Sequence, residues 1–287
     1  MGYLHINNLY KDRTILMFRE CYALEKIHGV STHLTWKPKE NQLHFFSSNV
    51  DQKEFIEIFD KDIKDKFANL FNTDITVYGE AYGSLQAMAN SYGNKLRFVA
   101  FDVNINGFWL EVPKAQNVCD KLNIEFVDWV VIPTDIESIN FERDRPSTQA
   151  KRNGIIEDKI REGVILRPLI EFMTKNGDRL IIKHKRNEFM ETKTPREVDD
   201  KHLKVLEDAK DIADEWVTEM RLKHVLDKLP PVTISDMKLI ITEMIKDIYR
   251  EAKGEIMEGR EVERAIANKT AKLFKNIASI VTPVPGV

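Results

Sequence analysis

The stretch Leu24-Glu25-Lys26-Ile27-His28-Gly29-Val30 is the sharpest local feature of the chain. It places a lysine at the end of a strand-like run and a glycine three residues later, where a turn would follow. A lysine at such a junction can act as a nucleophile, and a glycine lets the backbone approach a phosphate closely. The same residues also fit an ordinary surface lysine in a turn. The surrounding segments decide between these two interpretations.

Most of the chain before residue 190 has the pattern of β-strands joined by turns and short helices. The segments 32–36 and 42–46 flank a short polar loop and predict a β-hairpin. Helical spacing of apolar residues predicts one helix over 52–71 and a shorter one over 114–122. Further strands are predicted where Val, Ile, Phe and Tyr gather, at 73–79, 96–104, 108–112, 126–132, 163–168 and 179–185.

Two later segments carry charges next to apolar strands. Glu162-Gly163 leads into a buried-type strand, and Lys183-His184-Lys185 ends another one. Alternate residues of a strand share a face, so Lys183 and Lys185 project together. Two like charges side by side are unfavourable unless an anion lies between them, which favours an anion site. A solvated edge strand is the alternative interpretation.

Two more segments end strands with chemically useful residues. Glu80 follows Gly79 at the end of one predicted strand, and Gly83 comes shortly after it. The segment Phe98-Val99-Ala100-Phe101-Asp102 ends in an aromatic and an acidic residue. Taken alone, this second segment is most simply a core strand with a terminal aspartate.

The last third of the chain changes character near Thr192-Lys193-Thr194. Apolar residues then recur at helical spacing, beginning with Leu203, Leu206 and Trp216, and Pro230-Pro231 interrupts them. Thr233 and Asp236 have the spacing of a capping box for a further helix. We therefore predict an α+β protein, with an antiparallel-rich domain over residues 1–194 and a small all-helical domain over 195–287.

Composition excludes several classes of protein. The 43 basic and 46 acidic residues give a formal net charge of −3, which excludes a strongly basic nucleic-acid coat protein. No apolar run approaches the roughly 20 residues needed to span a bilayer. The two cysteines cannot build a disulfide framework or a zinc cluster. A reducing, cytoplasmic location without membrane contact is the simplest expectation.

Taken together and in this order, the segments resemble the covalent nucleotidyltransferase superfamily of ATP-dependent ligases and capping enzymes. They most resemble the RNA ligase 2 family, the phage and kinetoplastid-editing type. The matching segments are Glu25-Lys26-Ile27-His28-Gly29 for motif I, Gly79-Glu80 for motif III, residues 98–102 for motif IIIa, Glu162-Gly163 for motif IV and residues 183–189 for motif V. No predicted strand set follows motif V, which argues against a capping enzyme or a conventional DNA ligase.

The resemblance implies an adenylation domain that uses ATP together with Mg²⁺ or Mn²⁺. It implies that the catalytic residues are Lys26, Glu162, Lys183 and Lys185. It implies that the nucleotide is held by Glu25, Lys26, Ile27, His28, Gly29, Glu80, Phe101, Glu162, Ile165, Lys183 and Lys185. Among these, Glu162 is expected to hold the metal, Glu80 to bind the ribose and Phe101 to stack on adenine. At Glu25 the backbone is expected to matter more than the carboxylate.

The implied reaction joins 5′-phosphate and 3′-hydroxyl ends of RNA through a lysyl-AMP and a 5′-5′ adenylated RNA. A lysine is protonated at neutral pH, so Lys26 must lose a proton before it attacks. Lys183 and Lys185 would neutralise charge on the reacting phosphate. The expected partner is an RNA end in nicked or paired RNA. The oligomeric state is left open.

Two other functions stay open at this point. One is a small ATP-dependent ligase for DNA or mixed RNA/DNA nicks, and the other is an end-binding protein that has lost turnover. In most family members a basic residue lies in the strand after motif I, where this chain has Phe45-Phe46-Ser47-Ser48. Lys37, Lys39 or Arg167 could replace it. In the tail, Arg221 with Lys223, or Lys269 with Lys272 and Lys275, are candidates for gripping an RNA backbone.

Overall fold

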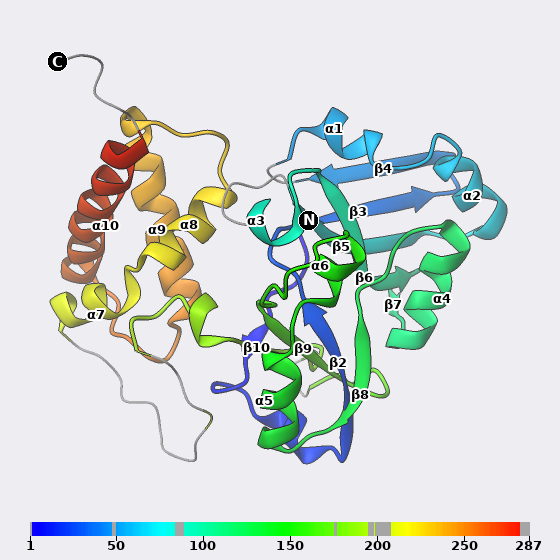
Figure 1. The fold of residues 1–287 in the computed structure, drawn as a ribbon, viewed down its shortest axis with the longest axis horizontal. Helices are drawn as coiled ribbons and strands as arrows, with labels where there is room; N and C mark the ends of the chain where they lie inside the picture. Colours follow the sequence, from blue (N-terminus) through cyan, green and yellow to red (C-terminus); the bar gives the residue numbers. More distant parts are fainter. Residues whose placement is uncertain are drawn as a thin grey trace. The chain divides into compact units, whose positions relative to one another are not determined.

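Two compact units make up the chain, residues 1–186 and residues 187–287 (Figure 1). The structure is a computed structural model, and it describes residues 2–47, 50–83, 89–174, 177–194, 198 and 208–281. Among these residues, no helix is both long and apolar enough to cross a bilayer. Both cysteines, Cys21 and Cys119, are buried and unpaired, and burial raises the pKa of Cys21 to about 12.

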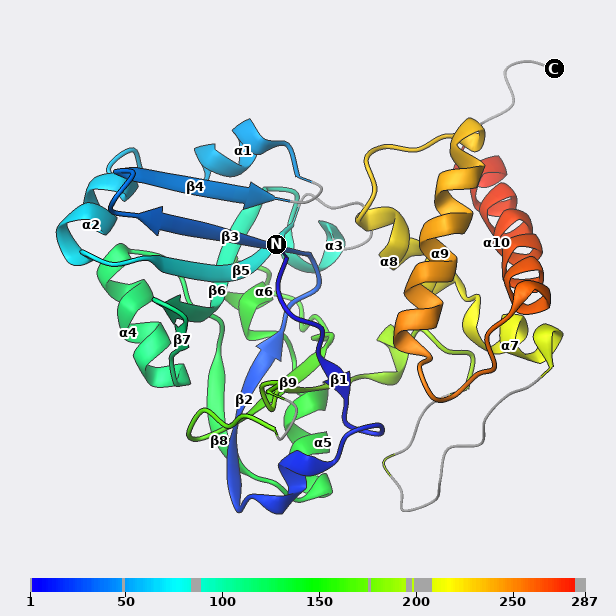
Figure 2. The ribbon, with the colours of Figure 1, turned by 180° about the vertical axis from the view of Figure 1, so that it is seen from behind.

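The first sheet of the first unit has the strand order β1-β10-β9-β2-β8 in the described part of the chain. Its strands are β1 (Asn7–Asn8), β2 (Glu20–Lys26), β8 (Trp129–Pro133), β9 (Gly163–Pro168) and β10 (Ile182–Lys185). Neighbouring strands are antiparallel except β1 and β10, which are parallel. Both strands that flank β9, namely β2 and β10, end in a candidate lysine. Figure 2 shows β1, β2, β8 and β9 from the opposite side.

The second sheet has the order β4-β3-β5-β6-β7, and its neighbours are all antiparallel. Its strands are β3 (Val30–Lys37), β4 (Gln42–Ser47), β5 (Ile75–Tyr82), β6 (Arg97–Ile105) and β7 (Phe108–Trp109). The chain passes from the first sheet to the second through Ile27, His28 and Gly29, between β2 and β3. The candidate nucleophile Lys26 therefore lies at the junction of the two sheets.

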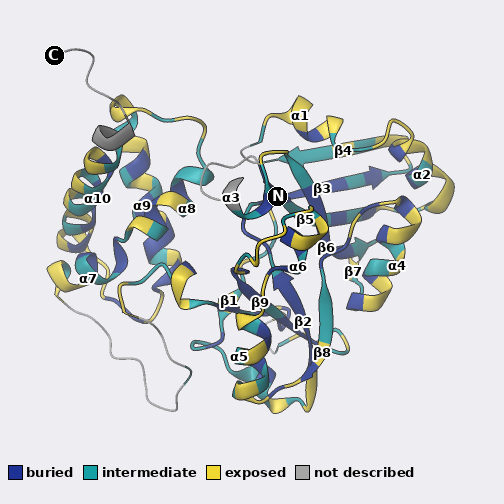
Figure 3. Ribbon diagram, in the orientation of Figure 1, coloured by how far each residue is buried: buried dark blue, intermediate teal, exposed yellow. Residues whose placement is uncertain are grey.

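Helices cover one face of each sheet. The second sheet is packed against α1 (Gln52–Glu57), α2 (Ile63–Leu70) and α4 (Val112–Leu122). The first sheet is packed against α5 (Ile136–Asp144). Three short elements complete the unit, namely η1 (Thr14–Met17), α3 (Ala89–Tyr92) and α6 (Thr148–Arg152). Figure 3 shows buried residues along the strands and exposed ones on the outward sides of the helices.

The sequence-based elements agree with the structure in kind, and several differ in extent. The hairpin is confirmed, because Thr32 to Lys37 pair with Ser47 to Gln42. The single helix predicted over 52–71 is wrong, since the chain turns between α1 and α2, where Asp60 pairs with Lys66. The apolar spacing continues across the turn because both helices bury their apolar residues against one sheet. The strand predicted over 108–112 ends at Trp109, since α4 begins at Val112 with a proline in its first turn.

The second unit consists of helices in its described part. They are η2 (Asn187–Phe189), α7 (Ala209–Trp216), α8 (Glu219–Asp227), η3 (Ile234–Asp236), α9 (Met237–Glu251) and α10 (Arg260–Val281). Trp216, Ile240, Met244 and Ile266 belong to its buried core. The predicted capping box is present, because the Thr233 N–H donates to Asp236 over 2.8 Å.

The prediction of a mixed α+β fold with antiparallel-rich sheets is confirmed. Leu203 and Leu206, which were expected in the first helical stripe, lie outside the described residues. Arg221 is wrong as a candidate for gripping RNA, because its side chain is 1% exposed and pairs with Asp247 and Glu191. The domain division at residue 194 remains a prediction.

Candidate active site

One carboxylate holds two lysines at the junction of the sheets. Lys26 Nζ donates to Glu162 Oε2 over 2.8 Å, and Lys185 Nζ lies 3.0 Å from Oε1 of the same group. Lys26 ends β2, Lys185 ends β10, and Glu162 comes directly before β9. The distances are those of charge-assisted contacts. The structure thus brings together three of the four residues predicted to be catalytic.

Strand register explains why these residues meet. Lys26 on β2 and Lys185 on β10 are both paired with Gly163, from opposite sides of β9. A Cβ atom on Gly163 would lie 2.1 Å from the carbonyl oxygen of His184, so a larger residue would push β10 away from β9. Glycine is therefore required for this close approach.

The electrostatics of the site keep Glu162 ionised. Burial alone would raise the pKa of this carboxyl, but the charges on Lys26 and Lys185 outweigh burial and hold its pKa well below the ordinary value. The Lys26 side chain keeps 19% of its surface exposed, whereas Glu162 keeps 1%. His28 Nδ1 lies 3.6 Å from Glu162 Oε2 and is the third nitrogen near this carboxylate. Lys26 is the member of the cluster that can reach an incoming substrate.

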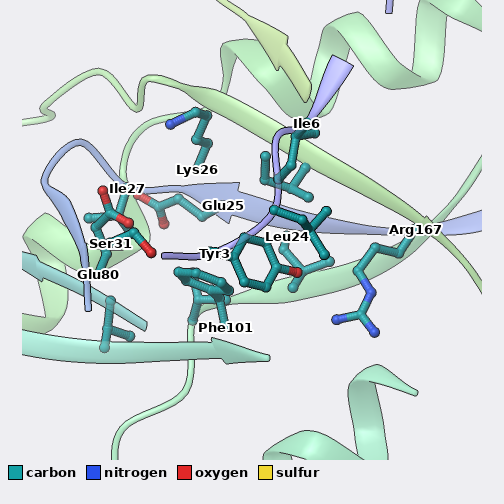
Figure 4. A pocket seen from close by; sticks show the side chains of 14 residues that line it. Tyr3, Ile6, Leu24, Glu25, Lys26, Ile27, Ser31, Glu80, Phe101 and Arg167 are labelled. Atoms are coloured by element: carbon teal, nitrogen blue, oxygen red, sulfur yellow. The ribbon is translucent and has the colours of Figure 1, made fainter. Parts of the chain in front are cut away.

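A pocket of about 180 Å³ opens beside Lys26 (Figure 4). Phe101 of β6 and Ile165 of β9 line it, so both sheets contribute apolar side chains. Figure 4 shows Lys26, Ile27 and Glu80 at one end of the pocket and Phe101 near its middle. A flat aromatic group has room between the two sheets, with polar side chains at one end.

The turn after Lys26 is fixed by close packing. A Cβ atom on Gly29 would lie 2.2 Å from the carbonyl oxygen of Ala81 on β5, so β3 and β5 leave no room for a side chain there. The His28 backbone N–H donates to the Tyr92 hydroxyl over 3.5 Å. The glycine of this motif thus serves the close approach of two strands, and it holds the turn that carries Ile27 and His28.

Glu25 lines the pocket, yet its carboxylate is engaged on the far side. Ser147 Oγ donates to it over 2.5 Å, and the N–H groups of Thr148 and Gln149 donate over 2.9 and 3.2 Å. Burial raises the pKa of Glu25, and the nearby Arg161 partly offsets this. The carboxylate therefore anchors the start of α6, and the role of the Glu25 backbone in binding a nucleotide remains a prediction.

The position of Lys183 supports a catalytic role less directly than the positions of Lys26 and Lys185 do. Lys183 on β10 is paired in register with Ile165 on β9, and Ile165 lines the pocket. Directly paired residues share a face of the sheet, so the Lys183 side chain is on the pocket face. It is partly exposed and is not one of the residues that line the pocket. Its catalytic role therefore remains a prediction, whereas Lys26 and Lys185 both contact Glu162 directly.

The N-terminal segment is the part of the site that sequence reasoning missed. Tyr3, Leu4 and Ile6 line the pocket, and β1 just after them pairs with β10. The Tyr3 ring meets Phe101 edge-on at 4.9 Å between centroids, and Figure 4 shows the two rings side by side. Nothing in Met1 to Ile6 has the pattern of a site, because parallel pairing over two residues leaves no periodic signal in the sequence.

A buried ionic cluster lies beside the apolar part of the pocket. Asp102 is fully buried, accepts from Arg167 over 3.1 Å and from Arg179 over 2.6 Å, and accepts from the Tyr3 hydroxyl over 2.5 Å. Arg167 also pairs with Glu171. Arg167 is therefore neutralised within the fold, and it is wrong as a replacement for the basic residue missing after motif I. Lys37, which lies 3.9 Å from Asp74, and the exposed Lys39 remain the candidates for that role.

Metal binding by protein groups alone is not supported in the described part of the chain, where no group of three or more His, Cys, Asp or Glu side chains could hold an ion. Glu162 Oε1 is buried and has no hydrogen-bond partner, although Lys185 lies 3.0 Å away. This oxygen can accept from a water molecule. The site therefore fits an ion that keeps its waters and binds mainly to a substrate's phosphates.

Comparisons with known proteins agree with this fold. A family model described as RNA ligase matches residues 19–185. Solved structures of RNA ligase from Naegleria gruberi share the fold at 14% identity. A mutant in its apo form and one with ATP and Mn have TM-scores of 0.51, and a mutant with AMP and Mn has 0.50. Each match covers 66% of this chain and 57% of the Naegleria chain. A search of curated proteins gave no match.

Proposed function

This chain belongs to the RNA ligase family, and we propose that it joins RNA ends with ATP through a lysyl-AMP on Lys26. The observation that carries the proposal is the pairing of Lys26 and Lys185 with one buried carboxylate, Glu162, at the mouth of a pocket that fits a base. A nucleophile, a phosphate-neutralising cation and a base pocket are then within reach of one bound nucleotide.

In the first step, Lys26 Nζ attacks the α-phosphorus of ATP. An N–P bond forms, the bond to the bridging oxygen of pyrophosphate breaks, and pyrophosphate leaves. Glu162 is a poor proton acceptor because its pKa is held low, so the proton of Lys26 leaves to solvent along its exposed 19%. Lys185 faces the developing charge on the phosphate and stabilises it. Such transfers need positioning and charge more than an acid–base pair.

A divalent ion, Mg²⁺ or Mn²⁺, would neutralise the phosphates and draw charge from the leaving pyrophosphate. Glu162 is the residue that would hold it, through a water on Oε1, the oxygen that also lies 3.0 Å from Lys185 Nζ. The Naegleria ligase structures with ATP or AMP and Mn support this choice of substrate and ion for this chain.

The base is held between the sheets. Phe101 stacks on adenine from one side, and Ile165 packs on it from the other. Glu80, at the polar end of the pocket, accepts from the ribose. The backbone at Glu25 accepts from the adenine amino group, because its carboxylate is already bonded to Ser147. Stacking alone accepts any purine, so this backbone contact would select ATP over GTP.

The AMP then passes to a 5′-phosphate, and a 3′-hydroxyl displaces it to leave a phosphodiester. We assign the first step to residues 1–194 and the grip on RNA to the helices of 195–287. The charges of that tail are balanced, so its contacts with RNA would come from local clusters such as Lys269, Lys272 and Lys275. Nicked or paired RNA is the proposed substrate, in a cytoplasmic setting.

The test is label transfer followed by joining. The protein is incubated with α-labelled ATP or GTP and Mg²⁺, resolved on a denaturing gel, and then given matched RNA and DNA nicks. Labelling by ATP and sealing of RNA support the proposal. Preferred sealing of DNA nicks would replace it by the DNA ligase alternative. Equal labelling by GTP would contradict the base assignment, and RNA binding without any labelling would indicate an end-binding protein that has lost turnover.

A further inference from the structure

A row of aromatic rings crosses the second sheet and ends at the nucleotide pocket. Phe46 on β4 stacks on His33 on β3, with centroids 4.6 Å apart and planes within 17°. His33 is 5.2 Å from Tyr78 on β5, and Tyr78 is 5.2 Å from Tyr3. Tyr3 in turn lies 4.9 Å from Phe101. We call Phe46, His33, Tyr78 and Tyr3 the aromatic row.

The aromatic row lies on the face of the sheet opposite the one that α1 packs against. Phe45, which alternates with Phe46 on β4, turns the other way and packs against Phe55 of α1. Along β3 the residues alternate between buried and partly exposed, and His33 is on the partly exposed side together with Ser31. Ser31 lines the pocket. The face that carries the row therefore continues into the nucleotide site.

All four rings of the row are partly exposed. Partly exposed aromatic rings in contact with one another are unusual on a surface that binds nothing, because each ring could have been buried or replaced by a polar residue. Trp109 also contacts Tyr78, but Arg179 covers its ring at 4.0 Å. The row is thus the part of this aromatic group that remains available to a ligand.

The row offers stacking surface and little charge. Burial lowers the pKa of His33 to about 4, so its ring is neutral near pH 7. Strand β4, at the edge of the sheet, reads Gln-Leu-His-Phe-Phe-Ser and contains no lysine or arginine. The rings of the row therefore supply no positive charge to a phosphate backbone. Their surface matches the flat faces of nucleic-acid bases, which stack on aromatic side chains when they are unpaired.

We propose that unpaired bases of the RNA strand being joined stack on the aromatic row as that strand approaches Lys26. The inference rests on the proposed RNA ligase function. It deepens that function, because it names the recognised feature as bases that are unpaired next to the joined end of an otherwise paired RNA. The row leads to Phe101, the position proposed for the adenine of the activated nucleotide, so bound bases lie next to the end that is activated.

The test compares binding with the first chemical step. Phe46→Ala and His33→Ala are titrated against a fluorescent single-stranded RNA, and their lysyl-AMP yields from labelled ATP are measured in parallel. We expect each variant to weaken RNA binding by roughly five- to a hundred-fold, the effect of losing one base stack. Their lysyl-AMP yields should equal that of the wild type, since neither residue lines the pocket.

The salt dependence and an abasic probe separate stacking from charge. The variants should keep the wild-type slope of log Kd against log salt, because no phosphate contact is lost. For the wild type, an RNA of equal length with abasic sites near its end should bind as weakly as the intact RNA binds to Phe46→Ala. Two results would overturn the proposal. One is a salt slope that differs between a variant and the wild type, and the other is an abasic RNA that binds the wild type as tightly as the intact RNA does.

Two further variants control for folding and for aromatic surface in general. Phe46→Leu keeps the apolar volume and should fold as the wild type does, yet it should still lose RNA affinity. Phe141→Ala removes a 74%-exposed ring of α5 outside the row, and it should leave RNA binding unchanged. Normal RNA binding by Phe46→Leu and Phe46→Ala would overturn the proposal. A wild type without any lysyl-AMP would instead refute the proposed function, whatever the RNA affinities.

Discussion

Replacing Glu162 by glutamine should destabilise the fold and slow lysyl-AMP formation together. The change keeps the shape of the side chain and removes the charge that Lys26 and Lys185 share at 2.8 and 3.0 Å. Removing one partner of a buried ion pair costs about 3–5 kcal/mol, and we expect the lower end, about 3 kcal/mol, because the 19% exposure of Lys26 lets water replace part of the contact.

The rate effect of Glu162→Gln follows from the same geometry. Lys26 loses the group that positions its amine, and a buried oxygen that could accept from a metal-bound water becomes neutral. Loss of one charged contact at a reacting group costs roughly 10²–10³-fold in rate. The assay is single-turnover labelling at saturating ATP, with the free energy of unfolding measured by urea titration. A variant with the wild-type rate would refute the role given to Glu162.

Glu142 provides a matched control for this experiment. It is also a buried carboxylate shared by two cations, with Arg161 at 2.7 Å and Arg145 at 2.9 Å, but it does not line the pocket. Glu142→Gln should lower the free energy of unfolding by a similar amount and leave the rate per folded molecule unchanged. A combined Lys26→Ala and Glu162→Gln variant should be more stable than the sum of the single changes predicts, because one unpaired ammonium is gone.

The other predictions concern affinity, domain roles and pH. Phe101→Ala should raise the ATP concentration for half-maximal labelling about 5- to 100-fold, whereas Lys185→Ala should lower the maximal rate; a Phe101→Ala defect that persists at saturating ATP would contradict this division. Fragments ending at Arg186 or at Thr194 should still label with ATP but lose most sealing of nicked RNA; full sealing would reassign the helices to another role. Burial, then the charge of Arg143, lowers the pKa of His184 to about 4, so the unfolded chain binds a proton that the folded chain does not. Stability should therefore fall below pH 6.5 by about 1.4 kcal/mol per pH unit until pH 4, and urea titrations of His184→Gln should show a flatter profile.

The sequence predicted the parts of the site that follow from strand alternation and from motif order. Strand alternation placed Lys183 and Lys185 on one face, and the motif order of the family resemblance brought Lys26, Glu162 and Lys185 into one site. The Gly163 position could be recognised as a turn, although its physical role, the contact with His184, needs the structure. Phe101 and Ile165 both line the pocket but come from different sheets. Only the family resemblance predicted that both would bind the nucleotide.

Other features depend on tertiary contacts that leave no local pattern. Tyr3 reaches the pocket because a two-residue strand pairs with β10. Arg167 looked available as a basic residue, but Asp102 lies 65 positions earlier in the chain and neutralises it. The turn at Asp60 divides the helix that was predicted over 52–71. Apolar spacing shows which side of a segment is buried, but it does not show whether the backbone turns, so the spacing continued across this turn. Whether a charged residue is exposed or buried likewise depends on partners that lie far from it along the chain.

The most direct test of the central claim is to locate the AMP on the protein. The wild type and Lys26→Ala are incubated with α-labelled ATP and Mg²⁺, and the labelled protein is digested and sequenced by mass spectrometry. We predict a single AMP adduct on Lys26, stable to alkali and released by acid, and none on Lys26→Ala. An adduct on Lys183 or Lys185, or undiminished labelling of a folded Lys26→Ala protein, would contradict the assignment of Lys26 as the nucleophile.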